Sequence, residues 1–557
     1  MSAFSANTRR ILSLWLPRLP IDRIKRELLA SKAFSSEVGT GSREENASKN
    51  KTSPANKKDG DAPSVVVAKE SNALKLYSLD DAAARYGLDI GMPLANARAI
   101  CPHLTVFDAD EAADAQLLND IADWCDRFTP LVALDPPHGL YLDISGCAHL
   151  FGGEAALLKL VCDLLTAQGF AVSAAIASTA ICARTLTRHV HGSIIADGEA
   201  ARAVAPLPVS TLGASEAITT GLRRAGLKTI GDVASRARYE ITARFGAAFT
   251  ARLEQALGEA DGPISPRKPL PDYIVEKRFP EPIATDTAIA ATLSKLAMML
   301  VAAMAQQGKG ARQLTACFFR TDGVVRGIVV DTGQAVTRTE VIDRLFRERL
   351  EALSDPLDPG FGFDLVRLSA SRTEIVVQQQ HDLDAHVHDN DEVAALIDRI
   401  AARIGSHRVV VCLPQDTHIP ERAELAVPAQ QNLVAASQAA WQPRIDDEPP
   451  LRPLRLFERP EQIQVIAQVP DGPPARFVWR RASHAVVRAE GPERIAMEWW
   501  RADGQEQGRG LTRDYFRVED EAGLRFWVYR DGLYDRERDA KTDQPVQPTW
   551  FMHGLFA

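Results

Sequence analysis

The sequence predicts a multidomain protein of the α+β class, and three observations lead to this prediction. At 557 residues the chain is too long to fold around a single hydrophobic core. Apolar residues change between strand-like and helix-like spacing along most of the chain, as in residues 273–368. Residues 476–557 instead hold five of the eight tryptophans and short strand-like runs, which predict a small β-rich domain.

The composition limits the class of protein. Hydrophobic residues make up 45% and charged residues 25% of the chain, as is typical of soluble globular proteins. A net charge of −8 argues against a uniformly basic nucleic-acid-binding protein, although a local basic region is compatible with it. The seven cysteines show no zinc-site spacing and are expected to be reduced thiols. No apolar run reaches the ~20 residues of a membrane span, so we expect a cytoplasmic protein without membrane contact.

The N-terminal region is expected to begin with a buried strand. Residues 11–16 are apolar apart from Ser13, as is typical of a central strand, and Pro17 ends the run. Residues 31–63 are rich in Ser, Asn, Lys and Glu and nearly lack apolar side chains. Because such a segment buries too little surface to offset its ordering entropy, we expect a disordered insertion.

The next segments alternate between helices, turns and strands. Residues 81–104 predict two helices joined by a Gly-Met turn, with Cys-Pro at the end of the second. Residues 136–139, Pro-Pro-His-Gly, predict a turn that enters an apolar strand at 140–144. Helical and strand patterns then alternate to about residue 189.

In this order, the segments resemble the palm and fingers of the Y-family translesion DNA polymerases, over residues 9–205. The Ser-Ile-Asp-Glu motif of that family falls on residues 136–139 of this chain, and the Asp-Met-Asp motif of its first strand falls on residues 15–17. The resemblance therefore implies that the catalytic acids are replaced. The degenerate positions are Trp15, Pro17, His138 and Gly139.

This degeneration bears on metal binding. Two-metal phosphoryl transfer needs carboxylates to hold Mg²⁺, and the residues at the degenerate positions offer none. Asp135 and Asp143 are nearby, but eight residues of extended chain would separate them by ~26 Å unless the chain folds back. We expect no catalytic residue, no metal and no cofactor, with an active polymerase that uses displaced acids as the alternative.

Residues 206–262 predict a helix-hairpin-helix unit that resembles the polymerase thumb. A glycine turn joins two helices, and Thr229 and Asp232 have the spacing of a capping box. Between Leu222 and Arg252 there are seven basic and two acidic residues, and amides at the start of the second helix could bind a DNA phosphate. A solvated basic helical pair is the alternative. The candidate DNA-binding residues are Arg223, Arg224, Gly226, Lys228 and Thr229.

A Pro-rich linker at 263–271 precedes a region with the order β-α-β-β-α-β. This order resembles the little finger of the Y family, which lies along DNA, and we assign it to residues 272–425. Arg312 and Arg320 are candidate phosphate contacts or ordinary surface residues.

The C-terminal part is divided into a linker at 426–450, rich in Gln, Ala and Pro, and an interaction domain at 451–557. Leu454, Leu456 and Phe457 resemble the peptide by which bacterial polymerases bind the sliding clamp, except that Pro453 stands where a Gln is usual. The alternative is a strand that enters the last domain. The tryptophans either fill a core or form a binding face.

Together, the retained domain order and the missing acids resemble the catalytically degenerate Y-family members of bacterial damage-induced mutagenesis. That resemblance implies an adapter that links DNA, the sliding clamp, a RecA-like partner and an error-prone C-family DNA polymerase. The alternatives are an active translesion polymerase and a DNA-binding module that acts without protein partners.

Overall fold

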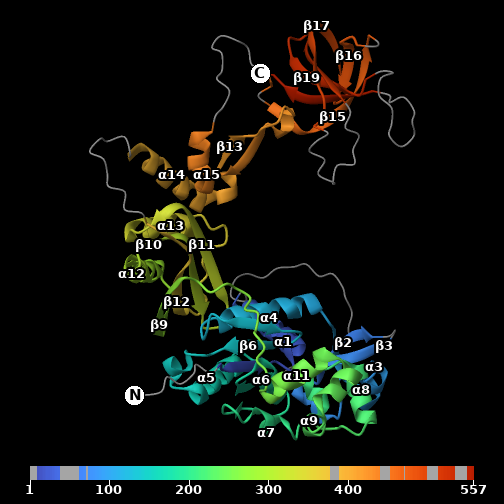
Figure 1. Ribbon diagram of the computed structural model, residues 1–557, viewed down its shortest axis with the longest axis vertical. Helices are drawn as coiled ribbons and strands as arrows, with labels where there is room; N and C mark the ends of the chain where they lie inside the picture. The colour runs from blue at the N-terminus through green and yellow to red at the C-terminus, as the bar shows by residue number, and fades with distance from the viewer. Residues whose placement is uncertain are drawn as a thin grey trace. The chain divides into compact units, whose positions relative to one another are not determined.

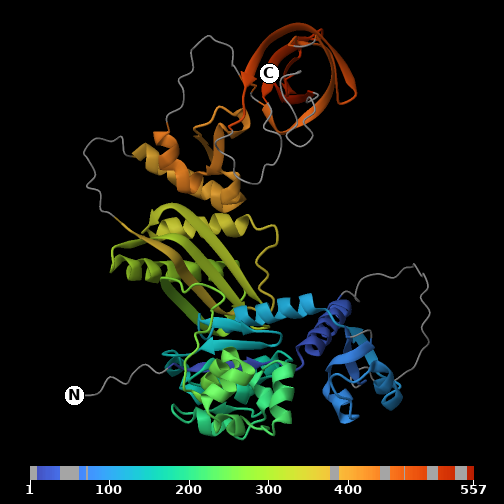
Figure 2. The same ribbon diagram turned by 45° about the vertical axis from the view of Figure 1, so that its right-hand side comes forward.

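The computed structural model divides the chain into two compact units, shown in Figures 1 and 2. The first comprises Met1–Val330 with Ala335–Gln379, and the second comprises Asp331–Gln334 with Gln380–Ala557. The structure describes residues 9–37, 62–70, 73–376, 388–439, 452–453, 455–468, 471–498, 512–533 and 548–556.

The palm is a five-stranded sheet in the first unit, with the strand order β5-β6-β1-β7-β8. Strand β1 (Ile11–Trp15) is central and almost wholly buried, as its apolar run predicts. It pairs antiparallel with β6 (Gly139–Asp143) on one side and with β7 (Ser173–Ala177) on the other. Strands β5 (Val132–Asp135) and β8 (Ser193–Ile194) form the edges.

Helices cover both faces of the palm sheet. Leu12 and Leu14 pack in one core with residues of α4 (Glu111–Cys125) and α5 (Glu154–Ala167). Because side chains alternate along a strand, Trp15 points to the other face, against which α6 (Ala180–Thr187) lies. The helices and strands expected before residue 190 are confirmed at these positions.

The fingers form a separate three-stranded sheet with the order β3-β2-β4. These strands are β2 (Ser64–Glu70), β3 (Ala73–Leu79) and β4 (Thr105–Asp108), and they pack against α2 (Asp81–Arg85) and α3 (Leu94–Ile100). Helix α1 (Leu19–Glu37) connects them to the palm. The expected insertion at 31–63 is therefore helical at its start, and residues 38–61 lie outside the described residues.

The thumb consists of short helices that share one core with β7 and α6. Helices α8 (Glu216–Arg224) and α9 (Ile230–Ala234) form the predicted hairpin, and the capping box of Thr229 and Asp232 is confirmed. The remaining thumb helices are α7 (Ala200–Val204), α10 (Arg238–Phe245) and α11 (Ala247–Leu257).

The little finger confirms the predicted β-α-β-β-α-β order. Its sheet has the strand order β11-β10-β12-β9, and the helices α12 (Asp286–Ala305) and α13 (Thr339–Glu351) accompany it. The strands are β9 (Tyr273–Ile283), β10 (Lys309–Arg320), β11 (Val325–Val336) and β12 (Phe363–Ile375).

Helix α12 differs from the expectation that no segment is long and apolar enough for a membrane span. Within the described residues it is the one helix that passes that test by length and composition, with a mean hydropathy of 1.8. Ile289, Leu293 and Leu300 are nevertheless buried in the little finger. A helix in the core of a soluble domain meets the same criteria, so α12 is read as a core helix.

The second unit begins with a small α/β element. It contains α14 (His388–Ile404), the hairpin of β13 (Val410–Pro414) and β14 (Glu424–Pro428), and α15 (Ala429–Gln438). The expectation of a linker from residue 426 is therefore wrong for its first part, where Gln- and Ala-rich residues form a helix. Residues 380–425, assigned to the little finger from the sequence, belong to this unit.

A closed six-stranded barrel ends the chain and confirms the β-rich domain (Figure 2). Trp550 lies in its core, and Trp527 is buried in a second cluster. The chain's apolar end forms the last strand, which pairs with the first and closes the barrel. The strands are β15 (Arg455–Ala467), β16 (Pro474–Trp479), β17 (Ala482–Ile495), β18 (Arg513–Asp520), β19 (Arg525–Asp531) and β20 (Thr549–Leu555). The fold is thus mixed α+β with a C-terminal β-barrel.

Candidate functional site

The residues at the degenerate polymerase positions meet at the ends of two neighbouring palm strands. Trp15 of β1 lies opposite Gly139 of β6 in the antiparallel register. The amide of Leu16 donates a hydrogen bond of 2.9 Å to the carbonyl of His138, and Pro17 follows directly. The structure therefore brings together the positions that the sequence comparison had matched to two separate motifs.

His138 lies in a partly buried aromatic environment. Its ring is 5.9 Å from the ring of Tyr77 at an edge-on angle of 64°. Burial is the main reason why the pKa of His138 is lowered. A neutral imidazole at this position carries no anionic oxygen for Mg²⁺.

Two arginines of α6 and its C-terminus bind the carboxylate of Asp135 beside these positions. Arg184 Nε lies 3.1 and 2.9 Å from the two Asp135 oxygens, and Arg188 Nη2 lies 3.2 Å from Oδ2. The Arg188 guanidinium also lies 5.5 Å from the centre of the Trp15 ring. The sequence reasoning missed this pair, although an i,i+4 spacing places both arginines on one helix face.

Asp135 also occupies the space beside Gly139. A Cβ atom added at Gly139 would lie 2.9 Å from both the backbone oxygen and Oδ2 of Asp135. Since real Cβ atoms do not approach other atoms so closely, any larger residue at position 139 requires Asp135 to move.

The surroundings of Asp135 are positively charged overall. Burial, and then the charge of Arg184, lower the pKa values of Arg188 and Arg252. Burial raises the pKa of the neighbouring Tyr141 further above its ordinary value of 10.0, so this hydroxyl adds no negative charge to the site. Two guanidinium groups therefore bind the carboxylate of Asp135, and the charge of a third, Arg252, lies within electrostatic range of it, an environment that repels a divalent cation.

Asp143 lies at the other end of β6 and is engaged separately. It accepts hydrogen bonds from Arg9 Nε at 3.1 Å and from the amide of Ser145 at 3.0 Å. Asp135 of β5 pairs with Gly139 of β6, and Asp143 lies four residues further along β6, so ~13 Å separate the two acids along the sheet. Across the described part of the chain, no group of three or more His, Cys, Asp or Glu side chains could hold a metal ion.

The thumb hairpin exposes basic side chains but not free amides. Arg223, Arg224, Gly226 and Lys228 are exposed, and Thr229 is half-buried. The amides of Lys228 and Thr229 donate to the carboxylate of Asp232 at 3.0 and 2.9 Å. The next two amides, of Ile230 and Gly231, donate to the backbone carbonyls of Leu207 and Ala205. The expectation that the amides opening α9 are available to a phosphate is therefore wrong, and any contact falls to the side chains.

The two candidate arginines of the little finger are already bound within the protein. Arg312 forms an ion pair with Glu374 at 2.8 Å. Arg320 forms ion pairs with Asp322 at 2.5 Å and with Asp358 at 2.8 Å. Either arginine must leave these carboxylates to bind a phosphate.

The candidate clamp-binding peptide is the first part of β15. Leu456 packs against a hydrophobic cluster of the second unit, and the ring of Phe457 lies 6.1 Å from that of Trp479 at 25°. Leu454 lies outside the described residues. The placement agrees with the alternative of a strand that enters the last domain, because Leu456 and Phe457 contribute to its packing.

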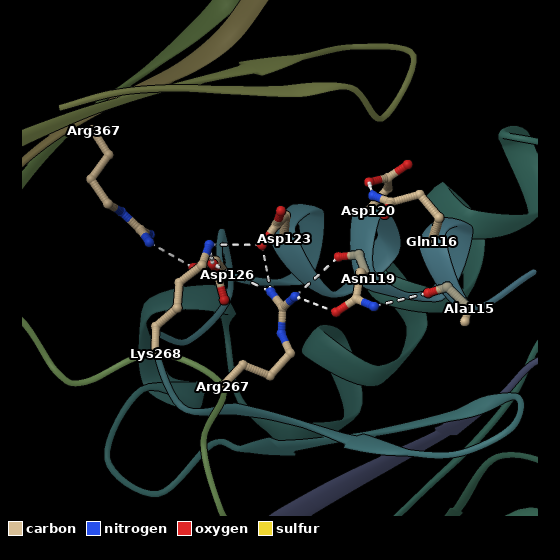
Figure 3. A network of polar contacts seen from close by, with 9 residues as sticks. All are labelled: Ala115, Gln116, Asn119, Asp120, Asp123, Asp126, Arg267, Lys268 and Arg367. Atoms are coloured by element: carbon tan, nitrogen blue, oxygen red, sulfur yellow. Dashed lines mark hydrogen bonds and ion pairs between the residues drawn. The ribbon is translucent and has the colours of Figure 1, made fainter. Parts of the chain in front are cut away.

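The sequence did not reveal a polar network between the linker and the palm (Figure 3). Lys268 binds Asp123 and Asp126 at 2.7 and 3.0 Å, and Arg267 binds Asp123 at 2.5 Å. Arg367 of the little finger donates to the backbone oxygen of Asp126 at 2.7 Å. The available signal was a pair of acids three residues apart around the C-terminal end of α4, where the helix dipole disfavours them and a cation is needed.

Comparisons with known proteins place this architecture in a family. Residues 57–188 match the model described as the impB/mucB/samB family, and residues 271–385 match the model of its C-terminal domain. Protein ImuB of Caulobacter vibrioides is 40% identical over 477 residues, which cover 84% of this chain and 100% of that protein. DNA polymerase IV of Methanoculleus marisnigri is 31% identical over 226 residues, or 39% of this chain and 61% of that protein.

Solved structures show similarity at low sequence identity. DinB from Sulfolobus solfataricus and an insertion ternary complex of Dbh DNA polymerase are each 14% identical, with TM-scores of 0.35 and 0.36. Each covers 66% of this chain and 100% of the solved chain. Because the match to ImuB covers most of the chain at 40% identity, the chain belongs to the ImuB-like, Y-family polymerase-related members of the impB/mucB/samB family.

Proposed function

We propose that this protein is a non-catalytic, DNA-associated adapter in damage-induced mutagenesis and translesion synthesis. Its family supports a role in mutagenesis or translesion synthesis. The observation that carries the non-catalytic part of the proposal is the Asp135 cluster, where Arg184 and Arg188 lie beside the degenerate positions.

The cluster supports this reading through charge and space. A polymerase needs acids that share metal ions with a triphosphate. Here Trp15 and Gly139 face each other, Asp135 fills the space at Gly139, and guanidinium groups surround that acid. The rival proposal, an active polymerase with displaced acids, has less support because Asp135 and Asp143 are both bound to arginines and lie apart.

The proposed partners are DNA, the sliding clamp, the RecA-like protein ImuA and an error-prone C-family polymerase, in the cytoplasm. DNA contact is proposed for the exposed side chains of Arg223, Arg224 and Lys228 around Gly226 and Thr229. Such contacts to phosphates bind DNA without reading its sequence and need no metal ion.

Primer extension tests the absence of catalysis. Purified protein with primed DNA, Mg²⁺ or Mn²⁺ and all four nucleotides is expected to add no nucleotide, while the same preparation binds the DNA equally well with EDTA. Asp135→Ala and Asp143→Ala variants serve as controls. Incorporation by the wild type that disappears in either variant would show that the displaced acids hold metal, and the proposal would be abandoned.

Clamp binding is proposed for the peptide around Leu454, Leu456 and Phe457, and the structure suggests how to test it. A synthetic peptide of residues 451–460 is expected to bind the clamp, and its Leu456→Ala/Phe457→Ala version is not. Full-length protein is then compared with the peptide, because β15 must release Leu456 and Phe457 from the barrel. A peptide that fails to bind contradicts this assignment. Binding by the peptide but not by the full chain would show that the barrel sequesters it.

A further inference from the structure

The little finger has an apolar groove between its two helices. Residues of α12, α13 and the loop after α13 line a cavity of about 600 Å³. This volume lies within the ~300–1,000 Å³ of typical ligand-binding clefts. Ile289, Leu293 and Phe346 are buried in its lining, and Leu350, Leu353 and Leu357 are half-buried there.

The groove has the length of two helical turns. Ser294 Oγ of α12 donates a hydrogen bond of 2.8 Å to Asp343 of α13 at one end. Asp286 and Glu351 also line the groove, eight residues before Ser294 on α12 and eight residues after Asp343 on α13, as expected for antiparallel helices. From Asp286 to Ser294 the lining extends over eight residues, or ~12 Å at 1.5 Å per residue. A helix presents side chains at i, i+4 and i+7 over the same distance.

The charges at the rim of the groove favour a partner with positively charged side chains. Asp286, Asp343 and Glu351 line the groove together with one arginine, Arg347. In the described part of the chain, Asp286 and Glu351 are exposed and form no ion pair. An acidic rim around an apolar floor attracts lysine and arginine side chains and repels the phosphates of DNA. The groove is thus chemically distinct from the basic thumb hairpin.

We propose that this groove binds an amphipathic helix of a partner protein, with apolar side chains on one face and basic residues flanking them. The apolar side chains would contact Ile289, Leu293 and Phe346, and the basic residues would pair with Asp286 and Glu351. The proposal adds a protein-docking surface to the adapter function and uses neither the polymerase site nor the clamp peptide. Its outcome is therefore independent of the primer-extension result.

Two neighbouring alanines of α12 provide a matched test. Ala290 lines the groove, whereas Ala291 is also exposed but lies outside the lining. Ala290→Trp fills the groove without removing a core side chain, and Ala291→Trp adds the same bulk elsewhere on the helix. On α13, Glu351→Lys reverses a rim charge, and Glu340→Lys reverses an exposed charge away from the groove.

The probe is a fluorescent peptide of about 16 residues, long enough to form a helix on binding. It carries leucines at i, i+4 and i+7 and lysines elsewhere, and a second peptide replaces the lysines with glutamates. Fluorescence anisotropy with full-length protein is read at about 150 mM salt. We expect the lysine peptide to bind the wild type, Ala291→Trp and Glu340→Lys equally, and Ala290→Trp and Glu351→Lys about tenfold more weakly. The glutamate peptide is expected to bind at least about tenfold more weakly to the wild type.

Three results would overturn the proposal. Equal affinity of both peptides would show that the rim charge does not select the partner. Equal affinity of Ala290→Trp and the wild type would show that the peptide binds elsewhere. A self-associated protein in sedimentation that Ala290→Trp dissociates and Ala291→Trp does not would identify a second copy of this chain as the occupant.

Discussion

At the scale of single residues, burial determines how a charged side chain affects the stability of the folded protein. Asp22 of α1 is 9% exposed and accepts a hydrogen bond from the amide of Ala171 at 2.9 Å. Burial raises its pKa from 3.8 to about 6, although this hydrogen bond and the charges of Arg18 and Lys25 oppose the rise. The folded protein therefore favours the protonated form of Asp22.

Replacing Asp22 with asparagine is expected to stabilise the protein at neutral pH. Because its pKa is higher in the folded state, Asp22 favours folding below about pH 4, and this contribution is lost as the pH rises through about 6. Asparagine stays neutral and can still accept from Ala171, so Asp22→Asn should raise the free energy of unfolding at about pH 7 by up to ~3 kcal/mol. Denaturant unfolding at about pH 4 and pH 7 measures this.

The exposed Asp163→Asn variant is the control, with an expected change within ~0.5 kcal/mol. If Asp22→Asn shifts stability equally at both pH values, Asp22 is not the group whose protonation changes.

At the scale of elements, the thumb hairpin forms from a local sequence motif, but the hydrogen bonds within the motif and to its surroundings determine which groups can contact DNA. The motif predicted the helices and the capping box, and both are present. The same capping carboxylate, Asp232, accepts the hydrogen bonds of the Lys228 and Thr229 amides, so these amides are not available to a phosphate. Positive charge is therefore available to DNA only through side chains.

Removing exposed thumb charges is expected to weaken DNA binding and its salt dependence. Arg223→Ala/Lys228→Ala should lower the slope of log affinity against log salt by about two, because each phosphate contact contributes about one. Fluorescence anisotropy across a salt series measures the slope.

Arg312→Ala serves as the comparison, because its guanidinium is paired with Glu374 and its loss should leave the slope unchanged. A slope that falls in Arg312→Ala and not in the thumb variant would move the DNA contact to the little finger.

At the scale of the whole molecule, charged groups join the palm and the little finger within the first unit. Arg127 is 6% exposed and forms an ion pair with Asp364 of β12 at 2.6 Å. Its guanidinium also lies 5.9 Å from the ring centre of Phe319, and its backbone oxygen accepts from Arg278 at 2.9 Å. Since much of this contact is ionic, loss of one buried partner should loosen it.

Arg127→Ala is expected to expose the linker between thumb and little finger. Trypsin can cut after Arg267 and Lys268, whose side chains are held by Asp123 and Asp126 in the native protein. Cleavage there should become several-fold faster in Arg127→Ala, because removal of the ion pair leaves Asp364 without its partner. Time-resolved digestion followed by mass spectrometry measures the rate.

Arg338→Ala, which removes an exposed ion pair with Glu340, should leave the cleavage rate unchanged. Equal rates in both variants and the wild type would show that Arg127 does not hold the little finger in place.

Much of the architecture could be predicted because it depends on local patterns. The apolar run of β1, the Asp-Gly turn at Asp322-Gly323 between β10 and β11 and the capping box at Thr229 each specify their element from neighbouring residues. Local reasoning was wrong at α15, where a Gln- and Ala-rich stretch expected to be a linker is helical. Composition alone does not distinguish these two outcomes.

The sequence by itself determined which residues stand at the degenerate polymerase positions and in what order the domains follow, because both depend only on positions along the chain. The tertiary structure decided what surrounds those positions and the thumb turn: Arg184 and Arg188 reach Asp135 from α6, and the backbone carbonyls of Leu207 and Ala205 accept the amides of Ile230 and Gly231. It also decided that α12 and α13 enclose an acidic-rimmed groove. These features arise from contacts between residues far apart in sequence, which no local pattern encodes.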